Sequence, residues 1–345
     1  KLTTTNINIK ITLNQEPQQP LFVKLINNGE VISSKTLIKG KNETTFNFST
    51  SEAHELIIED NKIHYQKILE PYLVLRFTGD VNLSSRFESV TNEKGADYLW
   101  RQINPLLKTA DISFLNLETS VSDRGRKVKE RLFFRTSPQN MMGLVNSGVD
   151  LVSVANNHTY DYGPIAFEDT LNFLTDNKIL YAGGGRDLNA ALEPKYINKK
   201  GMKIGFIAFN QIFNNTWGAA DNKSGQLGYD DYTRNAIFKA IREAAAECDQ
   251  LIVMAHWGVE RANLPKEETK LLARALIDAG ADLIVGSHPH VLQGVEVYKN
   301  KPIYYSVGNS IFTNKDEHTS GGAIFELKLN QEGIISAKFY PTYIE

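Results

Sequence analysis

Short apolar segments alternate with stretches of helical periodicity from residue 72 to the C-terminus. Four of the apolar segments are residues 73–78, 112–117, 151–155 and 251–255. Each has the length and composition of a buried strand. Strands that alternate with amphipathic helices are typical of α/β proteins, so this pattern predicts an α/β domain over residues 72–345.

Several of the predicted helices carry recognisable start and stop signals. Ser137 precedes a proline and is expected to cap a helix that ends at Gly148. Thr233 is the expected cap of a second helix. A third is expected to begin at Pro265 and to end at Gly280, since glycine is the commonest residue just past a helix C-terminus.

Residues 1–71 show only the signals of β-strands. Ile7, Ile9, Ile11 and Leu13 alternate with polar residues, which is the period of a half-buried strand. Further strands are expected in 21–26, 31–38, 44–48, 56–59 and 63–69, separated by turns rich in Asn and Gly. The segment is therefore predicted to form a small all-β, sandwich-like N-terminal domain, distinct from residues 72–345.

Polar residues stand at the ends of the apolar runs in the second domain. Ligands of open α/β sheets bind outside the carboxyl ends of the strands. Taken singly, such residues are commonly helix caps or turn residues. Here they form a set of oxygen and nitrogen donors without a thiolate: Asp80, Glu118, Asn157, His158, His256, His288 and His290. We therefore predict a metal site at this edge.

The number of these donors exceeds the needs of one four-coordinate ion. Two ions that share a carboxylate would use the whole set, and such pairs activate water for displacement at phosphorus. Oxygen and nitrogen ligands suit Mn, Fe or Zn and argue against a structural zinc site. A histidine left beside the ligands would serve as the general acid for the leaving group.

Composition limits the possible partners and the setting of the chain. The net charge of −2 gives no support to nucleic-acid binding. A basic cluster at residues 124–131, followed by Arg135, is either a solvated loop or a contact for an anionic substrate. Cys248 is the single cysteine, which excludes an intramolecular disulfide, and no apolar run reaches 18 residues. Because the chain starts at Lys1, we expect that a signal, an anchor or a tag has been removed.

The motifs also resemble a known family. Residues 77–81, 116–118, 154–163, 256–260, 280–290 and 305–309 match, in this order, the motifs of calcineurin-like metallophosphoesterases. The similarity is closest to the CapA branch, the poly-γ-glutamate capsule synthesis proteins. It covers residues 72–345 and implies a metallophosphoesterase-like β-sandwich core flanked by helices. The N-terminal segment lies outside it.

The resemblance also implies roles for single residues. Glu118 would bridge two ions, and His158 would be the acid beside the scissile bond. Asp80 and His290 would bind the first ion, and Asn157, His256 and His288 the second. Candidates for hydrogen bonds to these ligands or to the substrate are Asn82, Asn116, Glu260 and Asn309. Asp161 is expected to cap or orient the helix after His158.

The sequence departs from the family pattern at three positions. Asn82 stands where the superfamily's Asp-x-His motif has its histidine, so the first ion loses an imidazole. Glu118 is one methylene longer than the usual bridging Asp. Ser310 replaces the aromatic residue that usually follows Gly-Asn in CapA-like proteins.

The resemblance implies a protein of capsule or poly-γ-glutamate synthesis at the extracellular face of the cell membrane, anchored by an N-terminal segment outside this chain. Its activity would be metal-dependent hydrolysis of a phosphoester, with one or two divalent ions. Two alternatives are a non-catalytic metal-containing accessory that binds or guides an anionic polymer, and a metal-dependent amide hydrolase. Expected partners are the polymer or phosphoester and membrane-bound capsule synthesis proteins, with no nucleic acid.

Overall fold

The computed structural model divides the chain into two compact units, Lys1–Tyr72 and Leu73–Glu345. It describes residues 72–344, except 129–131, 213–216 and 313–316, together with six strands of the N-terminal segment. No helix in these described parts is long and apolar enough to cross a membrane.

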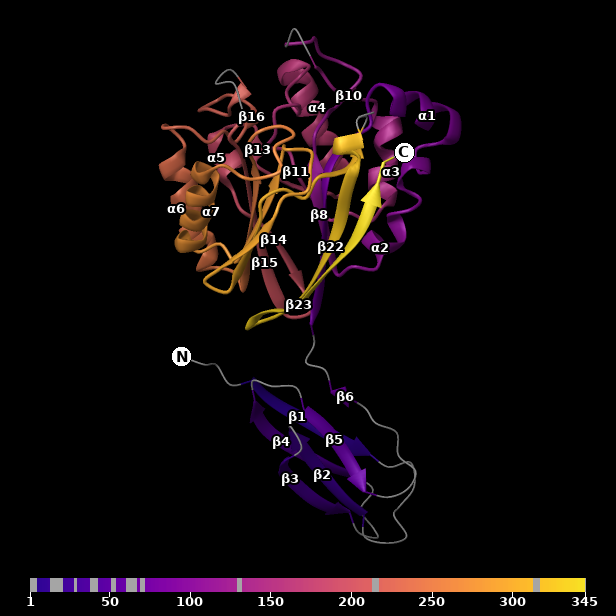
Figure 1. Cartoon of the computed structure of the whole chain (residues 1–345), viewed down its shortest axis with the longest axis vertical. Coiled ribbons are helices and arrows are strands. Elements are labelled where there is room, and N and C mark those ends of the chain that lie inside the picture. The colour runs from indigo at the N-terminus through magenta and orange to yellow at the C-terminus, as the bar shows by residue number, and fades with distance from the viewer. Residues whose placement is uncertain are drawn as a thin grey trace. The chain divides into compact units, whose positions relative to one another are not determined.

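The elements described in the smaller unit are all strands, in two sheets (Figure 1). The first sheet pairs β1 (Thr5–Thr12) with β4 (Glu43–Thr50). The second has the order β3-β2-β5-β6, with bounds Glu30–Leu37, Leu21–Asn27, His54–Glu59 and Lys67–Ile68. Of the strand predicted over 63–69, residues 63–66 and 69 lie outside the described residues.

The larger unit contains two sheets of mixed direction. The first has the order β12-β11-β8-β7-β22-β23, and β21 also pairs with β7. Its strands are β7 (Leu73–Asn82), β8 (Ile112–Leu117), β11 (Leu151–Ser153), β12 (Leu180–Ala182), β21 (Asn309–Phe312), β22 (Gly321–Asn330) and β23 (Gly333–Tyr343). We call this the first sheet.

The second sheet has the order β14-β15-β17-β18-β20-β19. Its strands are β14 (Lys195–Lys199), β15 (Met202–Asn210), β17 (Gln250–His256), β18 (Leu283–Ser287), β19 (Val295–Tyr298) and β20 (Lys301–Tyr304). Strands β15, β17, β18 and β20 run parallel to one another, so β15, β17 and β18 place their carboxyl ends on one edge.

The two sheets pack face to face around a core that draws on both. Phe77 and Phe114 of the first sheet and Phe206 of the second meet there, with ring centroids 5.2 to 5.4 Å apart. Helices α1 (Arg86–Lys94), α2 (Asn104–Lys108), α3 (Pro138–Asn146) and α4 (Gly163–Asp176) cover the outer face of the first sheet. Helices α5 (Leu188–Leu192), α6 (Arg234–Ala245) and α7 (Glu267–Ala279) cover the second.

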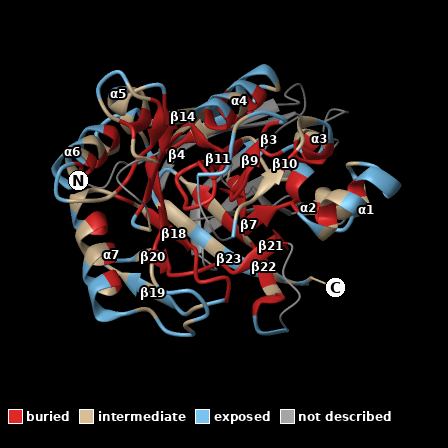
Figure 2. Ribbon diagram, turned by 90° about the horizontal axis from the view of Figure 1, so that it is seen from above, coloured by how far each residue is buried: buried red, intermediate tan, exposed pale blue. Residues whose placement is uncertain are grey.

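This four-layer arrangement confirms the predicted α/β class, with a β-sandwich core flanked by helices. In Figure 1 the helices α6 and α7 lie on one side of the strands and α1 to α3 on the other. Figure 2 shows the buried residues gathered along the strands between the helix layers. Two short strand pairs lie in the connecting segments. They are β9 (Ser120–Val121) with β10 (Arg135–Thr136), and β13 (Gly184–Gly185) with β16 (Gly225–Gln226).

The structure confirms some of the helix starts and ends predicted from the sequence. Ser137 caps α3, since its side chain accepts a hydrogen bond from the Asn140 N–H. Gly280 follows α7 with a φ of 126°, but this helix begins at Glu267, two residues after the predicted Pro265. Thr233 occupies the N-cap position of α6 as predicted, but its side chain makes no capping hydrogen bond, because its hydroxyl donates to the carbonyl oxygen of Gly228.

Candidate metal centre

The predicted donors come together where the strand ends of the two sheets meet. Asp80 is near the end of β7, and Glu118 follows β8 directly. His256 ends β17, and the loop after β18 carries His288 and His290. The five residues lie close together and are each at most 8% exposed.

These residues form two overlapping groups, which we call the acidic cluster. In each group one ligand atom per residue lies within 4.8 Å of the others. One group holds Glu118, His288 and His290, and the other holds Asp80, Glu118 and His256. Glu118 belongs to both, as a bridging ligand would. The resemblance assigns Asp80 and His290 to the same ion, and Oδ2 of Asp80 lies 3.2 Å from Nδ1 of His290.

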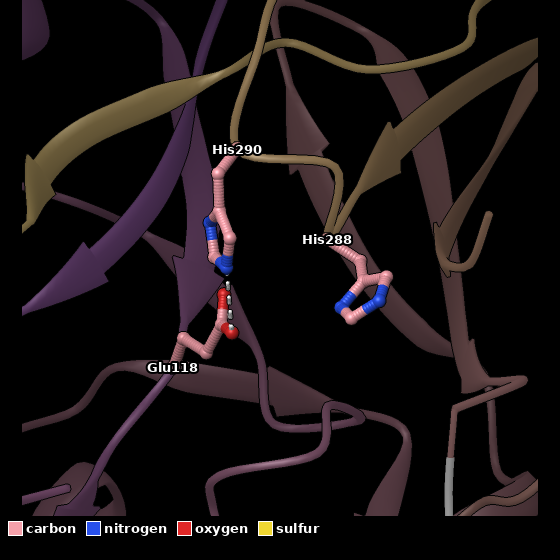
Figure 3. A group of neighbouring side chains, drawn as sticks. All are labelled: Glu118, His288 and His290. Atoms are coloured by element: carbon pink, nitrogen blue, oxygen red, sulfur yellow. Dashed lines mark ion pairs between the residues drawn. The ribbon is translucent and has the colours of Figure 1, made fainter. Parts of the chain in front are cut away.

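Glu118 occupies the centre of the cluster. Its Oε1 lies 3.7 Å from Nε2 of His290 and 3.8 Å from Nε2 of His256. Figure 3 shows His290 directed at the Glu118 carboxylate, with His288 beside it on the same loop. A cation held between these atoms would be coordinated by the carboxylate and by neutral imidazoles.

The tautomer of His290 follows from its contacts. Its Nδ1 lies 3.2 Å from Asp80 Oδ2 and 2.9 Å from Asn309 Oδ1, and both oxygens are acceptors. Nδ1 therefore carries the proton, which leaves the lone pair of Nε2 directed towards Glu118. A hydrogen bond to the far nitrogen is how metal-binding imidazoles are commonly oriented.

The electrostatics of the cluster favour positive charge. Burial opposes protonation of His290, but the hydrogen bond and the charge of Asp80 outweigh it and raise the pKa of His290. A field that attracts a proton to this imidazole also attracts a metal ion. Buried carboxylates need such compensation, because desolvation of a charge is costly. The donor set therefore fits divalent cations.

Both histidines of this loop have strained backbone conformations. His288 has a φ of 95° and His290 a φ of 58°, on either side of Pro289. Non-glycine residues rarely adopt positive φ, and such conformations gather at functional sites. The strain places both imidazoles on the side that faces Glu118.

Asn116 connects the two carboxylates, in line with its predicted place beside the ligands. It is the register partner of Asp80, and its Nδ2 donates to Asp80 Oδ1 at 2.7 Å and to Glu118 Oε2 at 3.3 Å. Asn156 in turn donates to the Asn116 side-chain oxygen at 3.1 Å. Asn156 was not predicted from the sequence, although this residue stands next to the predicted ligand Asn157.

Two further contacts position the His256 imidazole. Its Nε2 lies 2.8 Å from Asn157 Oδ1, which brings Asn157 into the cluster as expected. Its Nδ1 lies 2.8 Å from the hydroxyl of Ser287, the register partner of His256. Ser287 was not predicted either, although its position just before His288 could have identified it.

His158 follows Asn157 and is 5% exposed. Its ring lies against Phe134, which contacts Phe312, the neighbour of His290. Nδ1 of His158 donates to Asp161 Oδ2 at 2.7 Å, and the Phe134 N–H donates to the same oxygen at 2.7 Å. The expectation that Asp161 caps the following helix is wrong. Helix α4 begins at Gly163 after Tyr162, so the Asp161 carboxylate is used to hold the histidine.

Asn309 lies where it was predicted, within hydrogen-bonding distance of His290, and also donates to the Thr319 carbonyl oxygen at 2.9 Å. Glu260 does not. The chain turns at Gly258, whose φ is 85°, and Glu260 is exposed, without a hydrogen bond to a histidine among the described residues. Only its charge reaches the cluster, as a minor contribution to the raised pKa of His290.

Asn82 points to the same side of the first sheet as Asp80. Its register partner on β21 is Phe312, whose ring centroid lies 4.6 Å from that of His290. The side-chain oxygen of Asn82 accepts a hydrogen bond from the Ser84 N–H at 2.9 Å. The Nδ2 group is a donor that cannot bind a cation, so the side-chain oxygen, already engaged by Ser84, is the atom of Asn82 left for a metal. Phe312 supplies an aromatic ring beside His290, two positions after Ser310.

Comparisons with known proteins agree with this architecture. The family model for the bacterial capsule synthesis protein PGA_cap matches residues 74–314. The "PGA biosynthesis protein CapA" of Bacillus subtilis is 31% identical over 260 residues, which is 74% of this chain and 68% of the relative. The "Capsule biosynthesis protein CapA" of Bacillus anthracis is 29% identical over 278 residues, or 79% and 68%.

One solved structure supports the fold alone. It is a hypothetical protein from Thermus thermophilus, which superposes with a TM-score of 0.51 and 16% sequence identity. The superposition covers 79% of this chain and 100% of that one. Together with the family match, which covers most of the larger unit, these findings make the chain a member of the bacterial capsule synthesis protein PGA_cap family.

Proposed function

We propose that the acidic cluster binds one or two divalent cations, Mn, Fe or Zn, and that the protein hydrolyses a phosphoester in capsule or poly-γ-glutamate synthesis. The observation that supports this most strongly is the pair of ligand groups sharing Glu118, with the His158–Asp161 pair alongside. Membership of a capsule synthesis family supports the biological setting.

The protein's own groups divide the work between binding and proton transfer. Bound cations would supply a Lewis acid for the ester oxygens and lower the pKa of water. Asp80, Glu118, His256, His288 and His290 would hold them, with the Asn157 amide oxygen as a further ligand. Asn116 keeps the two carboxylates in a fixed orientation, which limits reorganisation during the reaction.

His158 is the group proposed to protonate the leaving oxygen. Asp161 accepts from its Nδ1–H, so Nε2 is the nitrogen that would protonate the leaving oxygen. A carboxylate in this position also stabilises the charged imidazole. Phe134 lies against the ring, with centroids 4.1 Å apart, and restricts its rotation.

The test combines metal analysis with turnover. Purified protein is expected to contain divalent metal by elemental analysis and to hydrolyse a generic phosphodiester with Mn²⁺. His256→Ala and His288→Ala should lose both properties. His158→Ala should keep its metal but lose about 10²–10⁴-fold in kcat, the usual contribution of a general acid. Metal-loaded wild type that is inactive on phosphoesters would contradict the proposal.

A non-catalytic role is the second candidate, and one observation favours it. Asn82 stands where the superfamily pattern has a metal-binding imidazole, and its side-chain oxygen already accepts a hydrogen bond from the Ser84 N–H, so the cluster has one imidazole fewer than that pattern. In this case the protein would bind or guide an anionic polymer. The accessory role would be supported over phosphoester or amide hydrolysis by two results together. His158→Ala would still bind the polymer, and wild type would turn over neither a phosphoester nor a γ-glutamyl amide.

We further propose that the protein works at the outer face of the cell membrane with membrane-bound capsule synthesis proteins, held by an N-terminal segment outside this chain. The expected result is that the native protein fractionates with membranes and is degraded by protease added to intact cells. Recovery from the soluble cell interior would contradict this placement.

A further inference from the structure

The core between the two sheets of the larger unit is open along one edge. The edge strands there are β23, drawn in yellow in Figure 1, and β19. Their neighbours in the two sheets, β22 and β20, meet in the core, where the ring centroids of Phe325 and Tyr304 lie 4.8 Å apart. The two edge strands extend beyond this contact.

Strand register places apolar side chains of both edge strands on the side that faces the core. Phe339 is the register partner of Phe325, and Val295 is that of Tyr304. Residues directly opposite each other on neighbouring strands share a face of the sheet. Even so, Phe339 is 63% exposed and Val295 is 50% exposed. Apolar surface that belongs to the core side of the sheets is therefore open to solvent.

Strand β23 carries the longer part of this surface. Alternate residues along the strand are all apolar and all exposed, and we call them the edge patch: Ile335, Ala337, Phe339, Pro341 and Tyr343. Phe339 and Tyr343 are each 63% exposed, which leaves about 200–300 Å² of their side chains uncovered. An apolar patch larger than roughly a few hundred Å² is uncommon on a monomer and marks an interaction site.

The backbone of β23 directs hydrogen-bonding groups away from β22. The Ile344 N–H donates to the Ser320 carbonyl oxygen at 3.0 Å, on the β22 side. Because the direction alternates along a strand, the N–H groups of Ala337 and Phe339 point to the outer side. Pro341 lacks an N–H on that outer side, so the proline leaves the pairing with β22 intact. An edge strand of 11 residues is a template on which another strand can pair.

The sequence of β23 complements itself in an antiparallel pair centred on Phe339. In this register each member of the edge patch lies opposite an apolar member, and the pairs are Phe339 with Phe339, Ala337 with Pro341, and Ile335 with Tyr343. Lys338, the single charged residue of the strand, lies opposite Tyr340. A register centred on Lys338 would instead oppose two lysines, and like charges directly opposite each other destabilise a sheet.

We propose that the protein forms a symmetric dimer in which β23 pairs antiparallel with β23 of a second copy, and the two edge patches cover each other. A two-fold axis at Phe339 makes the contact isologous, so the assembly closes as a dimer. One strand pair with its side chains makes a small interface, below about 1,200 Å² in total, so association should be reversible. The inference is independent of the proposed function, because β23 carries none of the ligands of the acidic cluster.

The test measures the mass of the full chain by analytical ultracentrifugation over a series of protein concentrations. We expect twice the 38.7 kDa of one chain at high concentration and a single chain on dilution. Phe339→Glu places two carboxylates opposite each other at the two-fold axis and should raise the Kd of the dimer roughly 30-fold or more, as loss of a hot-spot residue does. The matched control is Leu271→Glu, because Leu271 is 59% exposed on α7, and this variant should dimerise like wild type.

A charge exchange tests the register itself. Phe339→Lys should weaken the dimer as Phe339→Glu does, whereas an equimolar mixture of the two variants should form a dimer with one copy of each, since opposite charges then meet at the axis. Wild type that stays a single chain at every concentration would overturn the proposal, and so would equal weakening in Leu271→Glu. A mixture that does not associate would overturn the pairing centred on Phe339. Unchanged circular dichroism and Tm establish that each variant is folded.

Discussion

At the scale of single residues, the candidate metal centre depends on side chains that orient other side chains. Asn116 directs two carboxylates, Asp161 directs His158, and Asn309 selects the tautomer of His290. Local sequence identified Asn116 and Asn309 because they stand within or directly after strands. It misjudged Asp161, because a carboxylate before a helix has two possible uses and only the packed structure selects one.

Asn82 provides a direct test of metal binding. Asn82→His places an imidazole on the face of β7 that carries Asp80, in the position that the Asp-x-His motif uses. We expect metal affinity to rise on the order of tenfold, or about 1.4 kcal/mol, as measured by calorimetric titration with Mn²⁺. Asn82→Ala is the control and should show no gain. If both variants bind Mn²⁺ equally, Asn82 does not face the ion.

At the scale of elements, the cluster depends on how closely β7 and β21 approach. The Asp80 N–H donates to the Gly308 carbonyl oxygen at 3.1 Å, at a point where β7 and β21 shift register. Gly79 makes this approach possible, because a Cβ there would lie 1.8 Å from the same oxygen. The contact places Asn309 next to His290.

Gly79→Ala is therefore expected to destabilise the unit by about 1–3 kcal/mol, the usual cost of inserting a methyl group into closely packed structure. Metal affinity should fall as well, since Asp80 and Asn309 move apart. Urea denaturation and metal titration measure the two effects. Gly294→Ala is the control, because its Cβ would meet nothing within 4 Å. Equal loss in both variants would show that the β7–β21 contact is not the cause.

A buried ion pair joins β7 to β22 and predicts a pH dependence. Arg76 donates to Glu326 Oε2 through Nε at 2.9 Å and Nη2 at 2.6 Å. Burial alone would raise the pKa of Glu326, but the hydrogen bonds and charge of Arg76 outweigh it and lower that pKa below 4.5.

Because the folded state lowers this pKa, the stabilisation is present above pH 4.5 and is lost as the pH falls through the folded value. The free energy of unfolding should therefore decrease in acid, and Glu326→Gln should show a smaller decrease over the same range. Chemical denaturation at a series of pH values measures both slopes. Identical slopes would mean that Glu326 titrates normally in the folded protein.

At the scale of the whole molecule, the larger unit contains everything that the proposed function uses. The three hydrophobic clusters, the acidic cluster and His158 all lie within Leu73–Glu345. A unit of this size buries enough apolar surface to fold independently. We propose that residues 1–71 form a separate domain that takes no part in metal binding.

The corresponding experiment expresses residues 73–345 alone. We expect cooperative unfolding and the same metal content per chain as the full protein, measured by circular dichroism and elemental analysis. A chain that fails to fold, or that folds without metal where the full protein binds it, would show that the N-terminal segment completes the larger unit.

The sequence by itself determined the class of fold and the list of candidate ligands. Both follow from local patterns, because apolar periodicity reports which face of an element is buried and strand ends are visible as changes of composition. Only packing shows which side chains gather around Glu118, that Asp161 accepts a hydrogen bond from His158, and that Glu260 is exposed. These outcomes depend on sheet register, on the positive φ of His288 and His290, and on contacts between residues more than 100 positions apart, none of which is encoded in a short window.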